Sequence, residues 1–194
     1  MPAPTSLCAG PPGAPGLGAQ LSRRSTLLAL ACLPWAGVQA QPAELSELPR
    51  ARLLGQGKLT YFGLNVYGAR LWVADGFKPD DYVRHAVALE LEYARSLVGK
   101  LIAERSLTEM KKVGKVPDDK ASAWTTAMTQ AFPDVAKGDR ITGVYKPDEG
   151  MRFFFNGKPC GDVRDAEFAQ LFIGIWLSPR TSEPQLRLAL LGKP

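Results

Sequence analysis

The clearest pattern of hydrophobic and polar positions lies in residues 57–73, GKLTYFGLNVYGARLWV. Most of these residues are aromatic, β-branched or Leu, and the pattern predicts two strands, residues 58–62 and 64–73, joined at Gly63. Successive strand residues point to opposite faces. One face therefore carries Phe62, Leu64, Val66, Arg70 and Trp72, and the other carries Tyr61, Asn65 and Tyr67. The pattern places Arg70 on an apolar face, and a bulge at Gly63 or Gly68 would shift this phase.

A third strand is predicted over residues 86–94, where hydrophobic and polar residues alternate. Val87, Leu89, Leu91 and Tyr93 face one way, and Ala88, Glu90, Glu92 and Ala94 face the other. The two carboxylates are predicted to form the solvated face of an antiparallel sheet rather than an acid–base pair. Further strands are predicted over residues 140–146, 151–155 and 159–163, the last two joined by an Asn156-Gly157 turn.

Helical periodicity predicts helices over residues 96–112, 118–131, 165–177 and 181–191. Ser106 and Glu109 have the spacing of a capping box, so the first helix is expected to kink or restart there. Asp165 is the predicted N-cap of the third helix. Strands, two helices, strands and two helices follow one another along the chain. This order indicates an α+β fold with an antiparallel sheet packed on one side by helices.

The N-terminal region resembles an export signal. Residues 1–21 are rich in Pro, Gly and Ala and are expected to be disordered. Arg23-Arg24 precedes an apolar run over residues 26–38, which is too short to span a bilayer. Val38-Gln39-Ala40 then predicts cleavage after Ala40. The sequence therefore predicts a signal peptide over residues 1–40, of the twin-arginine type, and an exported or periplasmic domain over residues 41–194 with no transmembrane segment. A lipoprotein signal ending at Cys32 is the weaker alternative.

Charge and composition exclude several kinds of site. The net charge is +5, but no run of five Lys or Arg occurs, so nucleic-acid binding is not indicated. Cys160 is the only Cys outside the predicted leader and is interpreted as a small hydrophobic residue rather than a nucleophile. His85 is the only His, which argues against a metal site and a Ser-His-Asp triad. No cofactor is predicted.

Four ordered motifs resemble the bacterial chalcone isomerase-like proteins: GxGK followed by FGLNVYGARLW, LELEYARSLVGKLIAERSLTEM, FPDVAKGDRITGVY, and FFFNGKPCGDVRDAEFAQLFIGIWLSPRTS. The resemblance implies a large antiparallel sheet, a layer of helices against it, and a ligand cleft between the two. It also implies one of two chemistries. Plant chalcone isomerases close a chalcone to a flavanone, whereas the fatty-acid-binding branch holds a carboxylate with an Arg and a Tyr.

The resemblance assigns positions within the cleft. Lys58 occupies the place of the family's Arg, and Lys lacks the bidentate fork that suits a carboxylate. Tyr67 matches the partner hydroxyl, which is Thr in isomerases and Tyr in the fatty-acid binders. Leu101-Ile102 and Glu109 stand where isomerases carry a Tyr and an Asn, which puts chalcone cyclisation in doubt. Arg70 and Tyr93 are added as ligand-binding candidates on strand phase alone.

Three functional hypotheses follow. The leading one is an exported protein that binds a small amphipathic ligand such as a fatty acid, with Lys58, Tyr67, Arg70 and Tyr93 near the ligand. The second is an isomerase or intramolecular lyase acting on a phenolic or enone compound, with Lys58 as the anion-stabilising cation. The third is a structural or interaction module of the cell envelope. The sequence predicts no oligomeric state.

Overall fold

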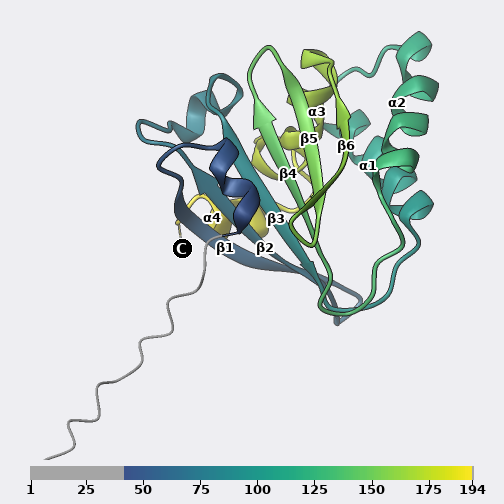
Figure 1. The fold of residues 1–194 in the computed structure, drawn as a ribbon, viewed down its shortest axis with the longest axis horizontal. Helices are drawn as coiled ribbons and strands as arrows, with labels where there is room; N and C mark the ends of the chain where they lie inside the picture. The colour runs from purple at the N-terminus through teal and green to yellow at the C-terminus, as the bar shows by residue number, and fades with distance from the viewer. Residues whose placement is uncertain (1–41, 194) are drawn as a thin grey trace, which may run out of the picture. The chain divides into compact units, whose positions relative to one another are not determined.

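The alternating segments of the chain form strands that pair in chain order (Figure 1). The computed structural model describes residues 42–193, and the predicted export signal over residues 1–40 lies outside them. Within the described residues, six antiparallel strands make one sheet: β1 (Arg52–Tyr61), β2 (Leu64–Val73), β3 (Val87–Tyr93), β4 (Arg140–Lys146), β5 (Gly150–Phe155) and β6 (Lys158–Val163). Each strand therefore lies beside its neighbour in the sequence.

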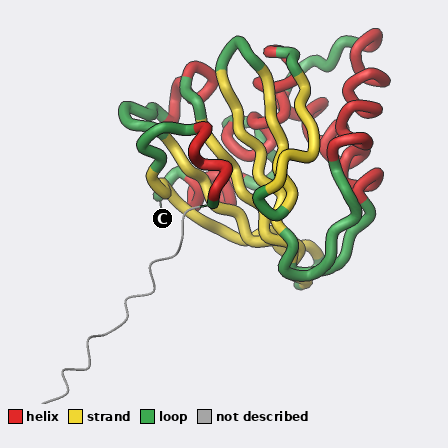
Figure 2. The backbone as a smooth tube through the Cα atoms, viewed as in Figure 1, coloured by secondary structure: helices red, strands yellow, loops and turns green. Residues whose placement is uncertain are grey.

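Four helices cover one face of this sheet (Figures 1 and 2). They are α1 (Gly99–Val113), α2 (Asp118–Ala131), α3 (Ala166–Leu177) and α4 (Pro184–Leu190), and α1 and α2 form the excursion between β3 and β4. Helix α3 packs on β4, β5 and α1, while α4 packs on β1. A short 3-10 helix, η1 (Ala43–Glu47), contacts the opposite face, and a second, η2 (Pro79–Arg84), lies between β2 and β3. The predicted α+β arrangement is confirmed.

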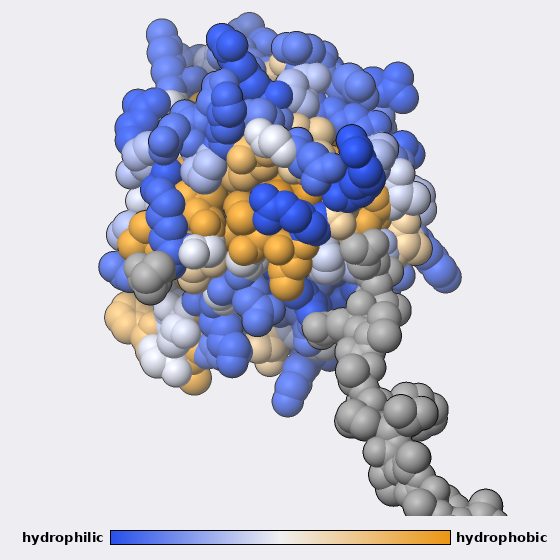
Figure 3. Space-filling model, turned by 90° about the vertical axis from the view of Figure 1, so that its left-hand side faces the viewer, coloured by the Kyte–Doolittle hydropathy of each residue, from blue (hydrophilic) through white to orange (hydrophobic). Residues whose placement is uncertain are grey.

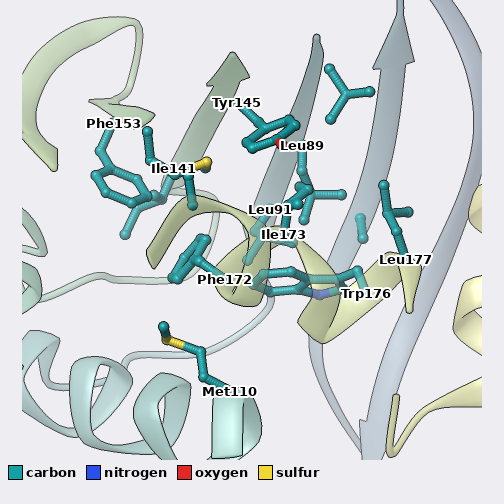
Figure 4. Packing of buried hydrophobic residues seen from close by; sticks show 14 of the residues in the cluster. Leu89, Leu91, Met110, Ile141, Tyr145, Phe153, Phe172, Ile173, Trp176 and Leu177 are labelled. Carbon is teal, nitrogen blue, oxygen red and sulfur yellow. The ribbon is translucent and has the colours of Figure 1, made fainter. Parts of the chain in front are cut away.

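The core between sheet and helices is rich in aromatic side chains (Figure 4). Phe168, Phe172 and Trp176 recur every four residues along α3, and successive ring centroids lie 5.5 Å apart. Phe153 of β5 meets Phe172 edge to face at 5.2 Å. Burying each such side chain stabilises the fold by about 2–3 kcal/mol. This contact fixes α3 against the sheet.

The predicted kink in the first helix is wrong. Helix α1 runs without interruption from Gly99 to Val113. The Ser106 hydroxyl donates to the Ile102 carbonyl within the helix instead of capping a new one. A Ser that bonds to the carbonyl four residues back can remain in a helix interior. The predicted cap at Asp165 is confirmed, because its carboxylate accepts from the backbone N–H groups of Glu167 and Phe168.

The second face of the sheet is also partly covered. Leu45 and Leu48, from η1 and the residue after it, pack on Ala88, Val144 and Phe154 of the sheet. On the same face Glu44 is buried, and its Oε1 accepts from the hydroxyl of Thr142 at 2.6 Å. The segment before β1 therefore closes a small second core.

The prediction that Glu90 lies on a solvated face is wrong. Glu90 is only 1% exposed. Arg70 Nε donates to its Oε1 at 2.6 Å, and Arg140 Nη1 donates to its Oε2 at 3.2 Å. Arg70 on β2 and Arg140 on β4 flank the carboxylate from the two strands beside β3. A buried charge is tolerated when it is paired in this way. Glu92, in contrast, is exposed, as expected.

The face of the described residues that Figure 3 shows is mostly hydrophilic. Seen from the side that carries β1, α4 and the C-terminal end, hydrophobic residues gather in one area among hydrophilic ones (Figure 3). Among residues 42–193, no helix is both long and apolar enough to cross a membrane.

Candidate functional site

A pocket of about 330 Å³ lies between the helix-facing side of the sheet and helices α1 and α3. Ligand pockets in proteins commonly occupy about 300–1,000 Å³ and are largely apolar. The walls of this pocket are apolar as well, and they include Leu59, Leu91, Leu97, Ile141, Phe172 and Ile175. Its volume and walls suit the hydrocarbon part of a small molecule.

An irregularity in the β1–β2 pairing shapes one wall. Leu59 pairs with Tyr67, but the next residue, Thr60, pairs with Asn65, so Val66 is an extra residue in β2. Such a bulge changes which face a side chain takes. Val66 and Tyr67 therefore both line the pocket although they are adjacent in the strand. The bulge is at Val66, not at either of the glycines that the sequence suggested.

Two phenols form the polar part of the pocket wall. Tyr67 and Tyr93 pair across β2 and β3, and their ring centroids are 6.1 Å apart. The Tyr67 hydroxyl accepts a hydrogen bond from Trp176 Nε1 at 3.0 Å, which leaves its own proton available to donate. Burial raises the pKa of Tyr67, and burial and the neighbouring Tyr67 raise the pKa of Tyr93. Both phenols are therefore neutral donors at physiological pH.

A cluster of charged and polar side chains lies at the side of the pocket formed by α1 and the segment after α3. Glu109 Oε1 lies 2.7 Å from Arg105 Nη2 and 2.8 Å from Lys112 Nζ, and its Oε2 accepts from the Ser182 hydroxyl at 2.6 Å. Burial alone would raise the pKa of Glu109. The hydrogen bonds from Lys112 and Ser182 and the charge of Arg105 lower that pKa below its ordinary value. Glu109 is therefore a carboxylate that ties α1 to the α3–α4 connection.

The structure brings together two of the four ligand-binding candidates from the sequence. Tyr67 and Tyr93 line the pocket, whereas Lys58 and Arg70 do not. Lys58 is exposed on the edge strand. Arg70 lies on the other face of the sheet, where Glu90 and Glu92 bind it. The suggested place of Arg70 near a ligand is therefore corrected, because its guanidinium serves the ion pairs of the second face.

Sequence reasoning missed Arg105, Trp176 and Ser182. Arg105 shares a helix face with Leu101 and Glu109, four residues to either side, and this i, i+4 spacing was the available signal. Trp176 falls within the helix predicted over residues 165–177, and Ser182 falls within the helix predicted over residues 181–191, although it lies just before α4 in the structure. The positions that the resemblance assigned to α1, Leu101-Ile102 and Glu109, do line the pocket.

The remaining candidate chemistry is weak. Cys160 is a half-buried free thiol, and burial raises its pKa to about 11, which disfavours the nucleophilic thiolate. Among the described residues, no group of three or more His, Cys, Asp or Glu is arranged to hold a metal ion. The polar groups that line the pocket include the two phenols, two serines and four charged side chains: Tyr67, Tyr93, Ser106, Ser182, Arg95, Arg105, Glu109 and Glu183.

Comparison with known proteins decides the family. A family model described as chalcone isomerase-like matches residues 36–192, most of the chain. The chain belongs to the chalcone isomerase-like family. The match spans all six strands and four α-helices of the described fold, so the whole architecture is that of a chalcone isomerase-like domain.

Two known proteins are similar to this chain, one in sequence and one in fold. An uncharacterized protein of Haemophilus influenzae is 29% identical over 140 residues, which cover 72% of this chain and 67% of that protein. The crystal structure of an Arabidopsis thaliana fatty-acid binding protein superposes with a TM-score of 0.56 at 13% identity, covering 74% of this chain and 87% of that one. At this identity the superposition shows a shared fold.

Proposed function

We propose that this protein binds a small amphipathic ligand, such as a fatty acid, in the pocket between the sheet and helices α1 and α3. The observation that supports this proposal most strongly is an apolar cavity whose wall includes two buried phenols, Tyr67 and Tyr93. An apolar chain fits the walls, and the phenols can donate hydrogen bonds to an oxygen of its head group. The fatty-acid binding activity named for the Arabidopsis protein of the same fold supports this proposal.

The charges around the pocket favour a ligand whose polar end is small. Arg95 and Arg105 line the pocket together with Glu109 and Glu183, so cations and carboxylates are balanced there. Arg105 is already held by Glu109, whereas Arg95 has no carboxylate partner within residues 42–193. A ligand carboxylate would thus be held by hydrogen bonds from the phenols, with Arg95 as the cation free to assist.

The isomerase hypothesis receives less support. It required Lys58 as the cation that stabilises a developing anion, and Lys58 lies outside the pocket. The position of the isomerase phenol on α1 is held by the aliphatic Leu101-Ile102. An aliphatic side chain at that position gives no proton or charge to a cyclisation step.

The test is a titration of the delipidated full chain with a fluorescent fatty-acid analogue. Tyr67→Phe removes a buried donor to the ligand, and we expect affinity to fall roughly tenfold, the effect of losing about 1–1.5 kcal/mol. Tyr145→Phe is the matched control, because that buried phenol donates to the Val83 carbonyl away from the pocket. It should lower stability but leave affinity unchanged. Absence of binding by the wild-type chain would overturn the proposal.

Export to the periplasm forms a separate part of the proposal. Arg23-Arg24, the short apolar run and the Ala40 cleavage signal support it. Cell fractionation followed by N-terminal sequencing tests it. A mature chain beginning at Gln41 in the periplasm is expected, and a cytoplasmic chain with an intact leader would contradict it.

A further inference from the structure

Exposed large hydrophobic side chains gather at one end of the described fold. Six are exposed in residues 42–193, and only Leu53 lies elsewhere. The other five belong to the β1–β2 hairpin end and the start of α1, and we call them the tip patch: Tyr61, Phe62, Leu64, Val98 and Leu101. The β1–β2 turn and the loop leading into α1 lie at the lower end of the sheet in Figure 1. Concentration of exposed apolar groups in one place marks an interaction surface.

The tip patch is continuous with the pocket. Tyr61 and Leu101 are exposed and also line the pocket, so the pocket opens onto the patch. Backbone hydrogen bonds hold the surrounding loops together: Ala94 N donates to the Val66 carbonyl, and Leu97 pairs with Val135. A ligand entering the pocket here would pass between the hairpin end and the first turn of α1.

Phe62 has a backbone conformation that is unfavourable for an aromatic residue. It is 89% exposed and has a positive φ of 48°. Aromatic residues rarely adopt this left-handed conformation, which favours Gly, Asn and Asp. Its ring meets the neighbouring Tyr61 ring edge to face, with the ring centroids 4.5 Å apart. Because Phe62 is strained and its exposed ring adds little packing to the fold, a functional role is a reasonable explanation for it.

The segments that form and flank the tip patch carry more cations than carboxylates. The three segments that meet there, residues 58–65, 94–101 and 132–138, contain four Lys or Arg and a single Asp. That carboxylate, Asp134, is bound to the backbone N–H of Gly99 at 2.8 Å. Arg95 and Lys137 are exposed and have no carboxylate partner among the described residues. A basic rim around exposed aromatic and aliphatic groups complements a bilayer with anionic head groups.

We propose that the tip patch docks on an anionic lipid bilayer, with Phe62 inserted among the lipids, and that amphipathic ligand passes there between bilayer and pocket. The transfer step rests on the proposed ligand binding, whereas the docking step does not. A lipid surface explains both the aromatic character of the turn and the cationic rim. It also explains why the pocket opens at this end.

The test compares two tryptophan variants of the full chain, Phe62→Trp and Leu53→Trp, on vesicles of phosphatidylglycerol and phosphatidylcholine with and without brominated acyl chains. Leu53 is the matched control, because it is exposed and apolar but outside the tip patch. Any binding through the leader affects both variants equally. We expect bromine to quench the added tryptophan of Phe62→Trp at least about twofold more than that of Leu53→Trp, and added salt to weaken the effect.

Equal quenching in the two variants would overturn docking. A shift of the Phe62→Trp emission without lipid, growing with protein concentration, would show that a second copy of the chain covers the patch and would also overturn it. Ligand titration without vesicles separates the two proposals. If ligand does not bind but Phe62→Trp is quenched selectively, the pocket function fails and docking stands.

Discussion

Two hairpin turns in this protein have nearly the same backbone and very different sequences. Both have two central residues with positive φ, 48° and 76° at Phe62-Gly63 and 49° and 82° at Asn156-Gly157. In each the flanking residues pair directly, Tyr61 with Leu64 and Phe155 with Lys158. This is the two-residue turn for which Asn-Gly is strongly preferred.

The Asn156 turn serves the fold. Its Oδ1 accepts from the backbone N–H of Arg140, and its Nδ2 donates to Asp139 at 2.9 Å. These bonds join the β5–β6 turn to the start of β4. The Phe62 turn makes no such bonds and exposes an aromatic ring beside the pocket mouth. The same backbone thus carries an anchoring residue in the β5–β6 turn and a residue suited to an external surface in the β1–β2 turn.

The largest expected effect is on ligand transfer. Phe62→Asn gives the first turn the residue of the second and removes the aromatic ring from the patch. We expect transfer of a fluorescent fatty acid from anionic vesicles to slow by roughly tenfold or more, because docking is lost. Stopped-flow fluorescence measures the rate, with Leu53→Asn as the control. Unchanged transfer would show that the two turns do not differ in this function.

A smaller effect is expected on stability at the second turn. Asn156→Ala removes two hydrogen bonds and places Ala in a left-handed conformation. The free energy of unfolding should fall by about 1–2 kcal/mol. Urea unfolding followed by circular dichroism measures it. If Phe62→Ala lowered the free energy of unfolding by the same amount, the two turns would not differ in their contribution to stability.

The stability of Phe62→Asn should change in the opposite direction. Asn tolerates the left-handed backbone better than Phe, and the exposed ring gives up little packing. We expect the free energy of unfolding to rise by about 0.5–1 kcal/mol. The same urea experiment applies. A variant that is both more stable and slower in transfer separates function from folding, and a destabilised variant would indicate that Phe62 supports the fold.

The smallest effect concerns pH. The backbone N–H of Ala136 and the side chain of Asn156 lower the pKa of Asp139. A carboxyl whose pKa is lowered by folding stabilises the protein above its unfolded pKa, and this contribution is lost as pH falls through the folded pKa. Asn156→Ala should therefore flatten the loss of stability in acid relative to the wild-type protein. Thermal unfolding at several acidic pH values measures this slope, and parallel curves would contradict the assignment.

Local features of the fold were predictable from the sequence because their causes are local. Helix α2 and strand β4 have the predicted bounds, since Pro117 and Pro133 mark the helix ends and Pro147 follows the strand. Asp165 caps α3 as expected, because a cap needs only the next three residues. The resemblance supplied the fold name and the places of Tyr67 and Glu109.

Features that depend on distant partners were not predictable from pattern alone. Glu90 is buried because Arg70 and Arg140, 20 and 50 residues away, flank it in the sheet. The face of Arg70 depends on the same pairing. The bulge at Val66 arises from the register with β1, and no glycine at that position indicates it in the sequence. Arg105 and Ser182 meet Glu109 only after α1 and the α3–α4 connection pack together.

The central claim is that the pocket of this chalcone isomerase-like protein holds an amphipathic ligand. Native mass spectrometry of the full-length gene product, purified without detergent, tests it most directly. We expect a bound small-molecule mass that disappears on denaturation, and a bound mass that returns when a fatty acid is added to the delipidated protein. A ligand-free mass, unchanged after fatty acid is added, would contradict it.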